Sequence, residues 1–570
     1  MRFHPSLRSR LGAVAAAVAV VWGCQAADAP EPMRQRPPDV AVVGTPTEFE
    51  GVNELVVAGS DFNAAIVHQL FVTLLEERPD FEEGPPTFAP YFAHSWEFSE
   101  DRTILTFRLR DDLAWSDGEP VTADDVRFSW EAQTSPEVRW SYAFAKENIS
   151  DVEVVDPHTV RFHFRRVYAT QLLDANEGVI LPRHAWSKLP FAEWRLQPQW
   201  FGEHLVTAGP FQLGRWRPQQ SLELRRNPTF FLTGRPRLEQ VIFRSIRESS
   251  GLLARLLAGE IDFTPQVRPA DAQRVLREAE LRLLEYPGRQ YTCISWNLRH
   301  PDGLFAEPEV RRALAHAIDR QAIVDTLWFG YARVASSPIL SSVWAHNPRV
   351  RPWPYDPARA RQLLERHGWA DRNGDGIREK NGVDFRFQLT TNPGNPQRWD
   401  AMQMIQTQLR AVGIEVQPEA VELQRLTAMN VAGEYDATVT AFAIDTSLDL
   451  TYAFHTSAIE GGYNYGGYSS AEADALIDEF NAAVDQREAL PVLQRLQDVI
   501  HRDQPFLFLW EPYRLVGHRA NLQGVHSNAL SEYYHLREWH QSDDPAVPPN
   551  GLEAETGERP AASPPTAPPA

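Results

Sequence analysis

An acidic, glycine-containing loop is the stretch of this sequence whose residue types and spacing best fit a metal site. It reads DRNGDGIRE, from Asp371 to Glu379. Side-chain oxygens at positions 1, 3, 5 and 9, with a glycine at position 6 for the sharp turn, suit Ca²⁺. Position 12 is Gly382, so the bidentate acid of an EF-hand is absent. The loop is therefore either a simple turn or a structural calcium site, and no other cofactor is expected. The ligands of such a site would be Asp371, Asn373, Asp375 and Glu379.

One of the two cysteines offers a different chemistry, the covalent attachment of lipid. Three arginines precede the uncharged run LGAVAAAVAVVWG, which ends immediately before Cys24. A basic segment followed by a short apolar one is typical of a secretory signal, and the run is too short to span a bilayer. The string VWGC resembles a bacterial lipobox, with Trp22 where a small residue is usual. We expect removal of residues 1–23 and lipidation of Cys24, with plain secretion and a spare thiol as the alternative.

Signatures of enzymes are absent from the sequence. It contains no H-E-x-x-H, G-x-S-x-G, Walker or G-x-G-x-x-G string. The 17 histidines are scattered without metal-ligand spacing, and no pattern brings two carboxylates to one scissile bond. We therefore expect a protein that binds a molecule without transforming it.

Composition narrows the class of protein further. With 570 residues, 43% of them hydrophobic, the chain is long enough for three or four structural units. The excess of 76 acidic over 56 basic residues, a net charge of −20, argues against a nucleic-acid binder, which needs a basic face. No apolar run reaches the ~20 residues of a membrane helix. Proline-rich segments at 24–39 and 543–570 indicate a flexible tether and a disordered tail.

The elements that must position any site alternate between strands and helices, which indicates an α/β architecture. Alternating residues predict a strand at Thr103–Arg110 and a hairpin at Val152–Arg165. Helices are predicted at Glu309–Leu327, at 357–367 behind the cap Asp356, and at Arg398–Val412. Gly413 stops the last of these, and the short strand Ile414–Val416 follows.

Several longer strings resemble one family when they are taken in order along the chain. These are SEDRTILTFRLRDDLAWSDGEPVTADDVRFSW from Ser99, TAGPFQLGRWRPQQSLELRRNPTFF from Thr207, FAEPEVRRALAHAIDRQAIVDTLWFGYA from Phe305, YDPARARQLLERHGW from Tyr355, MIQTQLRAVGIEV from Met404 and RLQDVIHRDQPFLFLWEPYRL from Arg495. They are similar to extracytoplasmic solute-binding proteins of ABC importers, of the oligopeptide/dipeptide-binding type. The matches cover roughly residues 60–530.

The resemblance implies an α/β, bilobal periplasmic-binding-protein-like fold of type II with an inserted third domain. By analogy, lobe I comprises 40–66, 200–285 and 512–542, the inserted domain 67–199, and lobe II 286–511. A ligand held between two lobes favours closure by contacting both. The implied partners are a small solute, an ABC permease and, through the lipid, a membrane; no nucleic acid is implied, and a monomer is expected.

The resemblance also implies candidate ligand-binding residues. Peptide-binding relatives hold the ligand's α-amine with an Asp in a Gly-Trp-x-x-Asp string, and the strand ending AFAID matches it at Asp445. The alternative is that Asp445 caps the following turn. Phe442 either walls the pocket or belongs to the core. Asn297, at the crossing into lobe II, either bonds backbone or touches ligand. Tyr463 and Tyr465 lie in a glycine-rich stretch that lines the site or is a plain surface loop.

One position argues against a strict dipeptide receptor. Dipeptide-binding members carry Arg-Pro-Tyr-Asn-Pro before a long helix, and the Arg side chain binds the ligand's carboxylate. This chain reads NPGNP from Asn392, so an amide stands where the guanidinium would be. Arg398 is nearby, but its place on the helix predicts a solvated side chain. We therefore expect a longer peptide or another polar ligand, with an oligosaccharide or metal-chelate binder, or a sensory receptor, as alternatives on the same scaffold.

Overall fold

The computed structural model describes residues 37–57 and 60–542. The predicted signal peptide, Cys24, the tether up to residue 36 and the proline-rich tail lie outside the described residues. All described helices and strands belong to one compact unit.

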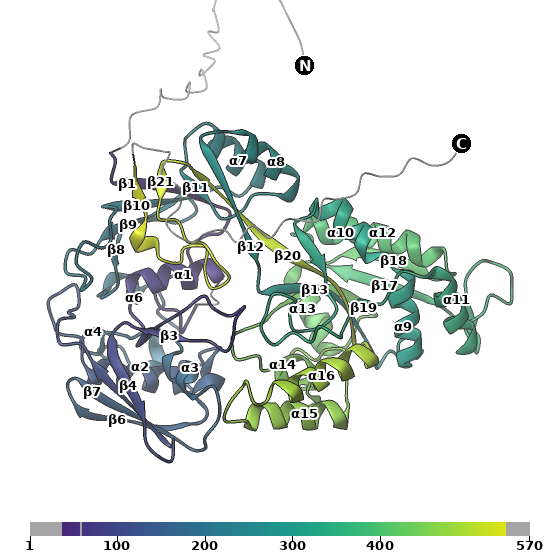
Figure 1. Ribbon diagram of the computed structural model, residues 1–570, viewed down its shortest axis with the longest axis horizontal. Coiled ribbons are helices and arrows are strands. Elements are labelled where there is room, and N and C mark those ends of the chain that lie inside the picture. Colours follow the sequence, from purple (N-terminus) through teal and green to yellow (C-terminus); the bar gives the residue numbers. More distant parts are fainter. Residues whose placement is uncertain (1–36, 58–59, 543–570) are drawn as a thin grey trace, which may run out of the picture. The chain divides into compact units, whose positions relative to one another are not determined.

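A twelve-stranded mixed sheet forms the framework of this unit (Figure 1). Its strands, in order across the sheet, are β18 (Glu415–Ala420), β17 (Arg386–Thr391), β19 (Ala437–Ala443), β13 (Gln290–Trp296), β20 (Phe506–Arg519), β11 (Phe263–Thr264), β1 (Val40–Thr45), β10 (Gln240–Ser245), β9 (Ser221–Arg226) and β8 (Phe211–Arg217), and β12 (Leu281–Pro287) and β14 (Ala332–Val334) also pair with β20. Strands and helices therefore alternate along the chain as the sequence predicts, and the fold is α/β.

The chain crosses between the two halves of the sheet twice, once where β12 continues into β13 and once along β20. The first part of β20 pairs with β13, and its last part pairs with β12 and β11. β12 and β13 follow each other through Gly288 and Arg289, beside Pro512 in the middle of β20. The Gly288 amide donates to the Pro512 carbonyl at 3.3 Å. A Cβ on Gly288 would lie 3.1 Å from that oxygen, so a side chain there would press the two crossings apart.

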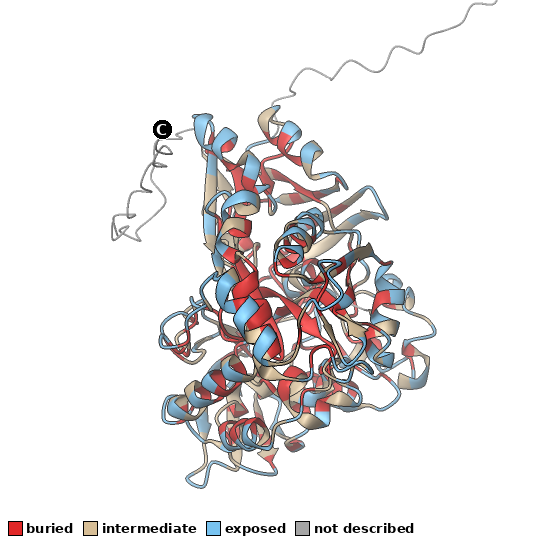
Figure 2. Cartoon of the chain, turned by 90° about the vertical axis from the view of Figure 1, so that its right-hand side faces the viewer, coloured by how far each residue is buried: buried red, intermediate tan, exposed pale blue. Residues whose placement is uncertain are grey.

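Helices cover both faces of the β13–β19 half of the sheet. Ile294, Trp296 and Val439 pack in one core and Tyr291, Cys293 and Phe442 in the other, because successive side chains of a strand point to opposite faces. The helices of this half are α9 (Pro308–Ala317), α10 (Arg320–Trp328), α11 (Pro357–Arg366), α12 (Pro396–Arg410), α13 (Leu423–Ala432), α14 (Thr451–Phe454), α15 (Ala471–Ala482) and α16 (Leu490–Asp503). Figure 2 shows the buried residues gathered on the strands and inner helix faces.

The other half of the large sheet carries α1 (Asp61–Leu70), α7 (Ser249–Leu257) and α8 (Ala272–Arg277). Between α1 and β8 the chain forms a second, four-stranded sheet in the order β4-β5-β7-β6. Its strands are β4 (Ala93–Phe98), β5 (Ile104–Leu109), β6 (Ile149–Asp156) and β7 (Thr159–Phe164), and its helices are α2 (Ala123–Thr134), α3 (Gln171–Asn176), α4 (Arg183–Trp186), α5 (Phe191–Trp194) and α6 (Trp200–Glu203). The small strands are β2 (Leu75–Glu77), β3 (Phe88–Pro90), β15 (Glu379–Lys380), β16 (Val383–Asp384), β21 (Leu522–Gln523) and β22 (His540–Gln541).

Most local predictions are confirmed, and one is wrong. β5 and the β6–β7 hairpin lie where the alternation predicts them. Asp356 caps α11, accepting from the Arg359 amide at 2.8 Å, and Gly413 follows α12 with φ +85°. The single helix predicted at Glu309–Leu327 is instead two helices, α9 and α10. The Asp319 carboxylate accepts from the Ala322 amide at 3.0 Å and begins α10 afresh, after Ile318 has become extended.

Candidate functional site

The ends of several strands lie together at one edge of the large sheet. β17 runs parallel to both β18 and β19, so their carboxyl ends lie at the same edge. β13 is antiparallel to β19, which places its first residues, and the crossing at Arg289, at that edge as well. In α/β proteins ligands bind outside the carboxyl ends of parallel strands. The candidate site is therefore built from the residues that follow β17 and β19.

Asp445 follows β19, and the structure shows it in one of its two predicted roles. Its Oδ1 accepts a hydrogen bond from the Ser447 amide at 2.9 Å and another from the Ser447 hydroxyl. It thus caps the turn, while Oδ2 makes no hydrogen bond to the described residues. The side chain is exposed, yet protein surrounds it, and this desolvation raises the pKa of the Asp445 carboxyl. Because Oδ2 makes no hydrogen bond to the described residues, it is available to a cation.

A second carboxylate, from a distant part of the chain, is influenced by the charge of Asp445. Glu77 ends β2, and burial raises its pKa from 4.5 to about 7, although a hydrogen bond with Thr446 and the charge of Arg289 oppose the rise. Its Oε1 is buried without a hydrogen-bond partner. Glu177, after α3, and Asp445 both add to the rise in the Glu77 pKa. The charge of Arg289, at the crossing between β12 and β13, acts to lower the pKa of both Glu77 and Asp445.

Aromatic side chains missed by the sequence reasoning lie on the same side. Tyr142 is 53% exposed and Phe144 is 62% exposed, and their rings lie 5.9 Å apart. Burial raises the pKa of Tyr142, and the charges of Glu177 and Asp445 raise it further, so its hydroxyl is near the acidic groups. Trp140 contacts Tyr142 in turn. The spacing of two between these three aromatics, the last of which lies in the short helix Ala143–Lys146, was the available signal.

The predicted aromatic residues divide between the core and the surface. Phe442 is 9% exposed and stacks on Phe506 at 5.2 Å, so it belongs to the core. Tyr463 is 54% exposed, and its ring contacts those of Tyr452 and Tyr465 at 6.3 Å and 5.9 Å. The Tyr452 hydroxyl donates to the Ala443 carbonyl at 3.4 Å, beside Asp445. Tyr463 and Tyr465 therefore stand near the end of β19 through Tyr452.

Asn297 has a structural role. The residue is buried, and its Nδ2 donates to the carbonyls of Gly433 and Tyr435 at 3.1 Å and 2.7 Å. Its Oδ1 accepts from the Arg299 amide at 3.1 Å. Both donor positions of the amide are thus occupied by backbone carbonyls. The ligand contact considered for Asn297 from the sequence is therefore replaced by a structural role.

Asn392 and Arg398 form a pair at the end of β17. Arg398 Nη1 donates to Asn392 Oδ1 at 3.1 Å. The expectation that Arg398 is solvated is wrong, because the side chain is half-buried and its Nε has no hydrogen-bond partner. The residue lies at the third position of α12, and its side chain returns to the strand end instead of extending into water.

The loop from Asp371 to Glu379 uses its side-chain oxygens for its own turns. Asp371 accepts from the amides of Gly374 and Gly376 at 2.7 Å and 3.0 Å, one bond to each carboxylate oxygen. Asp375 accepts from Ile377, and Glu379 from Arg372. Within residues 37–57 and 60–542 no group of three or more His, Cys, Asp or Glu side chains is placed to hold a metal ion. This geometry favours the simple turn.

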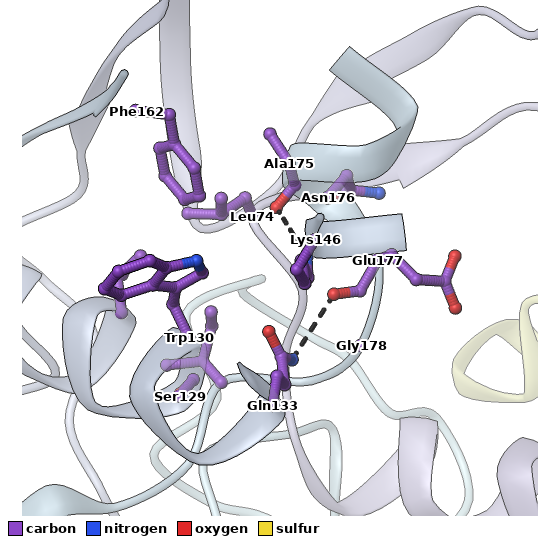
Figure 3. Close-up of a pocket in the computed structure, with 12 residues that line it drawn as sticks. Leu74, Ser129, Trp130, Gln133, Lys146, Phe162, Ala175, Asn176, Glu177 and Gly178 are labelled. Carbon is purple, nitrogen blue, oxygen red and sulfur yellow. Dashed lines mark hydrogen bonds between the residues drawn. The ribbon is translucent and has the colours of Figure 1, made fainter. Parts of the chain in front are cut away.

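A buried lysine supports the segment that carries Glu177 (Figure 3). Lys146 donates to the carbonyls of Asp174 and Ala175 at 2.6 Å and 3.4 Å, at the end of α3. Burial lowers the pKa of Lys146 to about 8. The adjoining cavity measures about 10 Å³, room for one water at most, so it holds no ligand. In Figure 3 the Glu177 carboxylate points away from this cavity.

Comparison with known proteins decides the family. The sequence profile of bacterial extracellular solute-binding proteins, family 5, matches residues 87–464. The chain belongs to this family. Its members lie outside the cytoplasm, and its relatives are binding proteins, not enzymes. No helix in the described part of the chain has the length and hydropathy needed to cross a membrane.

Individual relatives bind different solutes. The oligopeptide-binding protein AppA of Bacillus subtilis is 28% identical over 508 residues, which are 88% of this chain and 90% of AppA. Its structure in complex with a nonapeptide superposes with a TM-score of 0.75, covering 89% of this chain and all of AppA. NikZ of Campylobacter jejuni, solved with Ni(L-His), is 23% identical with a TM-score of 0.76 over 89% of this chain and all of NikZ, and shares the fold. The heme-binding protein A of Haemophilus influenzae is 25% identical over 80% of this chain and 83% of its own length.

Proposed function

We propose that this protein is a lipid-anchored receptor that binds short peptides outside the cytoplasm and delivers them to an ABC transporter permease. The observation that carries the ligand class is the free Oδ2 of Asp445, at the end of β19. An exposed carboxylate whose second oxygen is not used within the described residues is suited to the ammonium group of a peptide. The exposed rings of Tyr142 and Tyr463 supply apolar contact area for side chains.

The backbone of β19 supports the same ligand class. β13 pairs with all of Ala437–Ala443, whereas β17 pairs only with Ala437 and Thr438. Thr390 and Thr391 donate to the carbonyls of Ala437 and Val439, which shows that odd-numbered residues face the β17 side. The backbone of Ala441 and Ala443 therefore faces the space beyond the end of β17, where the Tyr452 hydroxyl already donates to the Ala443 carbonyl. An extended peptide can hydrogen-bond to the remaining groups of such a strand edge.

Native mass spectrometry of the purified protein, followed by mild denaturation, tests the ligand class. Because closure around a ligand slows its release, a bound solute survives purification, and we expect a mixture of short peptides. A sugar or a metal chelate, for which the exposed tyrosines are equally suitable partners, would overturn the peptide class and leave the family unchanged.

Lipid anchoring and delivery need separate experiments. The variant Cys24→Ser should move the protein from the membrane fraction to the soluble fraction. A protein that stays in the membrane fraction would contradict lipidation at this residue. Loss of peptide uptake on deletion of a neighbouring permease gene would support delivery, whereas unchanged uptake with an altered transcriptional response to peptide would favour a sensory receptor.

A further inference from the structure

The strands at one end of the large sheet are basic, although the chain as a whole is acidic. β8, β9 and β10 form the end of the sheet opposite to β18 (Figure 1). Residues 211–247, which contain these strands, hold eight arginines and two glutamates, with no lysine or aspartate. The whole chain carries a net charge of −20. Positive charge is thus concentrated on one part of an acidic protein, which favours contact with an anionic partner there.

β8 and β9 turn one face toward the core and the other toward solvent. Leu222 and Leu224 of β9 are buried in the core, and Trp216 of β8 lies opposite Leu222. Successive side chains of a strand point to opposite faces. Arg215 and Arg217, the two neighbours of Trp216, therefore point to the outer face, and both are exposed.

Two further arginines lie on the same outer face. Ser221 of β9 pairs with Arg217 on one side and with Arg244 of β10 on the other. Arg225 lies four residues along β9 from Ser221 and shares its face, and Arg225 and Arg244 are both exposed. A small side chain thus separates two arginines whose Cα atoms are about 10 Å apart, a spacing from which both guanidinium groups can reach one phosphate.

Few acidic groups oppose these charges. Glu223 is the one acidic residue in the three strands, and it lies 3.6 Å from Arg225. Among the described residues, no carboxylate lies within ion-pair distance of Arg215 or Arg217. The outer face of β8–β10 therefore has an excess of positive charge that the surrounding chain does not neutralise.

The described chain begins beside this face. β1, its first strand, starts at Val40 and pairs with β10 along its whole length. Residues 24–36, which join Cys24 to the described chain, span at most about 45 Å. A lipid on Cys24 would therefore keep the outer face of β8–β10 within reach of the bilayer. Such tethering raises the effective concentration of the two surfaces, so that a weak contact is sufficient.

We propose that the outer face of β8–β10 binds the anionic headgroups of the membrane to which the protein is anchored, and so holds the receptor on the bilayer in one orientation. The inference uses the lipid anchor of the proposed function, but the contact itself needs no lipid on Cys24. A basic patch combined with a lipid gives stable membrane attachment where one lipid chain alone is marginal. Guanidinium groups bind phosphate through paired N–H donors, and salt screens such exposed contacts.

Sedimentation with vesicles tests the proposal. The protein is the chain from residue 24 with Cys24→Ser, which cannot carry the lipid and retains every described helix and strand. The vesicles contain phosphatidylcholine alone or an equal mixture with phosphatidylglycerol. We expect the protein to bind the mixed vesicles at least about tenfold more tightly than the neutral ones at low salt, and to dissociate at about 1 M salt. In Arg215→Gln/Arg217→Gln, affinity for the mixed vesicles should fall about fivefold for each arginine removed.

A matched control lies in the other half of the sheet. Arg366 of α11 and Arg425 of α13 are exposed, so Arg366→Gln/Arg425→Gln changes the net charge equally and should bind the mixed vesicles as the native protein does. Equal affinity for both kinds of vesicle, or native affinity of the Arg215→Gln/Arg217→Gln variant, would overturn the proposal. Neither result would affect the lipid anchor, which fractionation of Cys24→Ser tests separately.

An acidic protein is the alternative partner of this face. If the native protein ignored both kinds of vesicle while Arg215→Gln/Arg217→Gln lost peptide uptake in cells, the face would contact a protein and the membrane proposal would be wrong. Circular dichroism and an unchanged affinity for peptide verify that each variant is folded.

Discussion

Asp445 Oδ1 accepts a hydrogen bond from the backbone amide of Ser447 at 2.9 Å, while Oδ2 makes no hydrogen bond to the described residues. One carboxylate therefore closes a turn with one oxygen and leaves the other free at the end of β19. The turn fixes the direction in which Oδ2 points. The two roles weighed for this residue from the sequence are compatible, because they use different atoms.

The substitution Asp445→Asn separates these two roles. Asn keeps the oxygen that caps the turn but loses the negative charge, so we expect an unchanged midpoint of thermal unfolding. Affinity for peptides with a free amino terminus should fall about tenfold or more, whereas affinity for N-acetylated peptides should change little. Titration of both peptide forms measures this. Equal losses for the two forms would show that Asp445 does not bind the ammonium group.

Glu77→Gln should change how stability depends on pH. Burial raises the Glu77 pKa from 4.5 to about 7, so between these pH values the folded chain holds a proton that the unfolded chain has released. The free energy of unfolding contributed by this group therefore falls as pH rises through that window. Gln remains uncharged at every pH. We therefore expect the free energy of unfolding of Glu77→Gln, relative to that of the native protein, to be about 1–3 kcal/mol higher at pH 8 than at pH 5.

Urea unfolding at pH 5 and pH 8 checks this prediction against a control. Asp445 and Glu177 also have raised pKa values and titrate in the same direction, so only the difference between native protein and variant is attributed to Glu77. Glu100 is exposed, and Glu100→Gln should leave the native pH profile unchanged. A Glu77→Gln profile that parallels the native one would contradict the prediction.

Phe81→Ala should loosen the contact between the β2–β3 loop and the sheet half that contains β13. The Phe81 ring is 5% exposed in a core that includes Ile339 and Val343, and its carbonyl accepts from the Trp344 amide at 3.3 Å. Removing the ring should lower the free energy of unfolding by about 3 kcal/mol. Phe144→Ala, at an exposed ring, should change it by less than about 0.5 kcal/mol. Equal effects of the two substitutions in urea unfolding would show that Phe81 does not stabilise this contact.

Chelation of divalent metal should leave the stability unchanged. Because backbone amides already occupy both carboxylate oxygens of Asp371, the 371–379 loop is held without an ion. We expect EDTA or excess calcium to shift Tm by less than about 1 °C, whereas Asp371→Ala should lower it by removing two hydrogen bonds. A calcium-dependent rise in Tm that disappears in Asp371→Ala would establish a calcium site here.

Local patterns predict those features that depend on neighbouring residues alone. The alternation at Thr103–Arg110 predicts β5, and Asp356 and Gly413 mark helix ends, because a strand's period and a helix cap are set within a few residues. The helix predicted through Ile318 failed for a local reason too, since the apolar periodicity outweighed the capping signal of Asp319. The order of the longer strings along the chain was sufficient to indicate the family and its α/β fold.

The sequence by itself thus determined the class of protein and the alternation of strands and helices, and it pointed to the strand end at Asp445 as a candidate site. Only the tertiary structure decided what the individual polar side chains do. The Asn297 amide donates to a carbonyl 136 residues further along the chain, and a hydrogen bond joins Glu77 of β2 to Thr446. Arg398 bonds to Asn392 and forms no ion pair within the described residues. The physical reason is that the state of a buried polar group depends on which donors and acceptors the fold brings to it, and these come from distant parts of the chain.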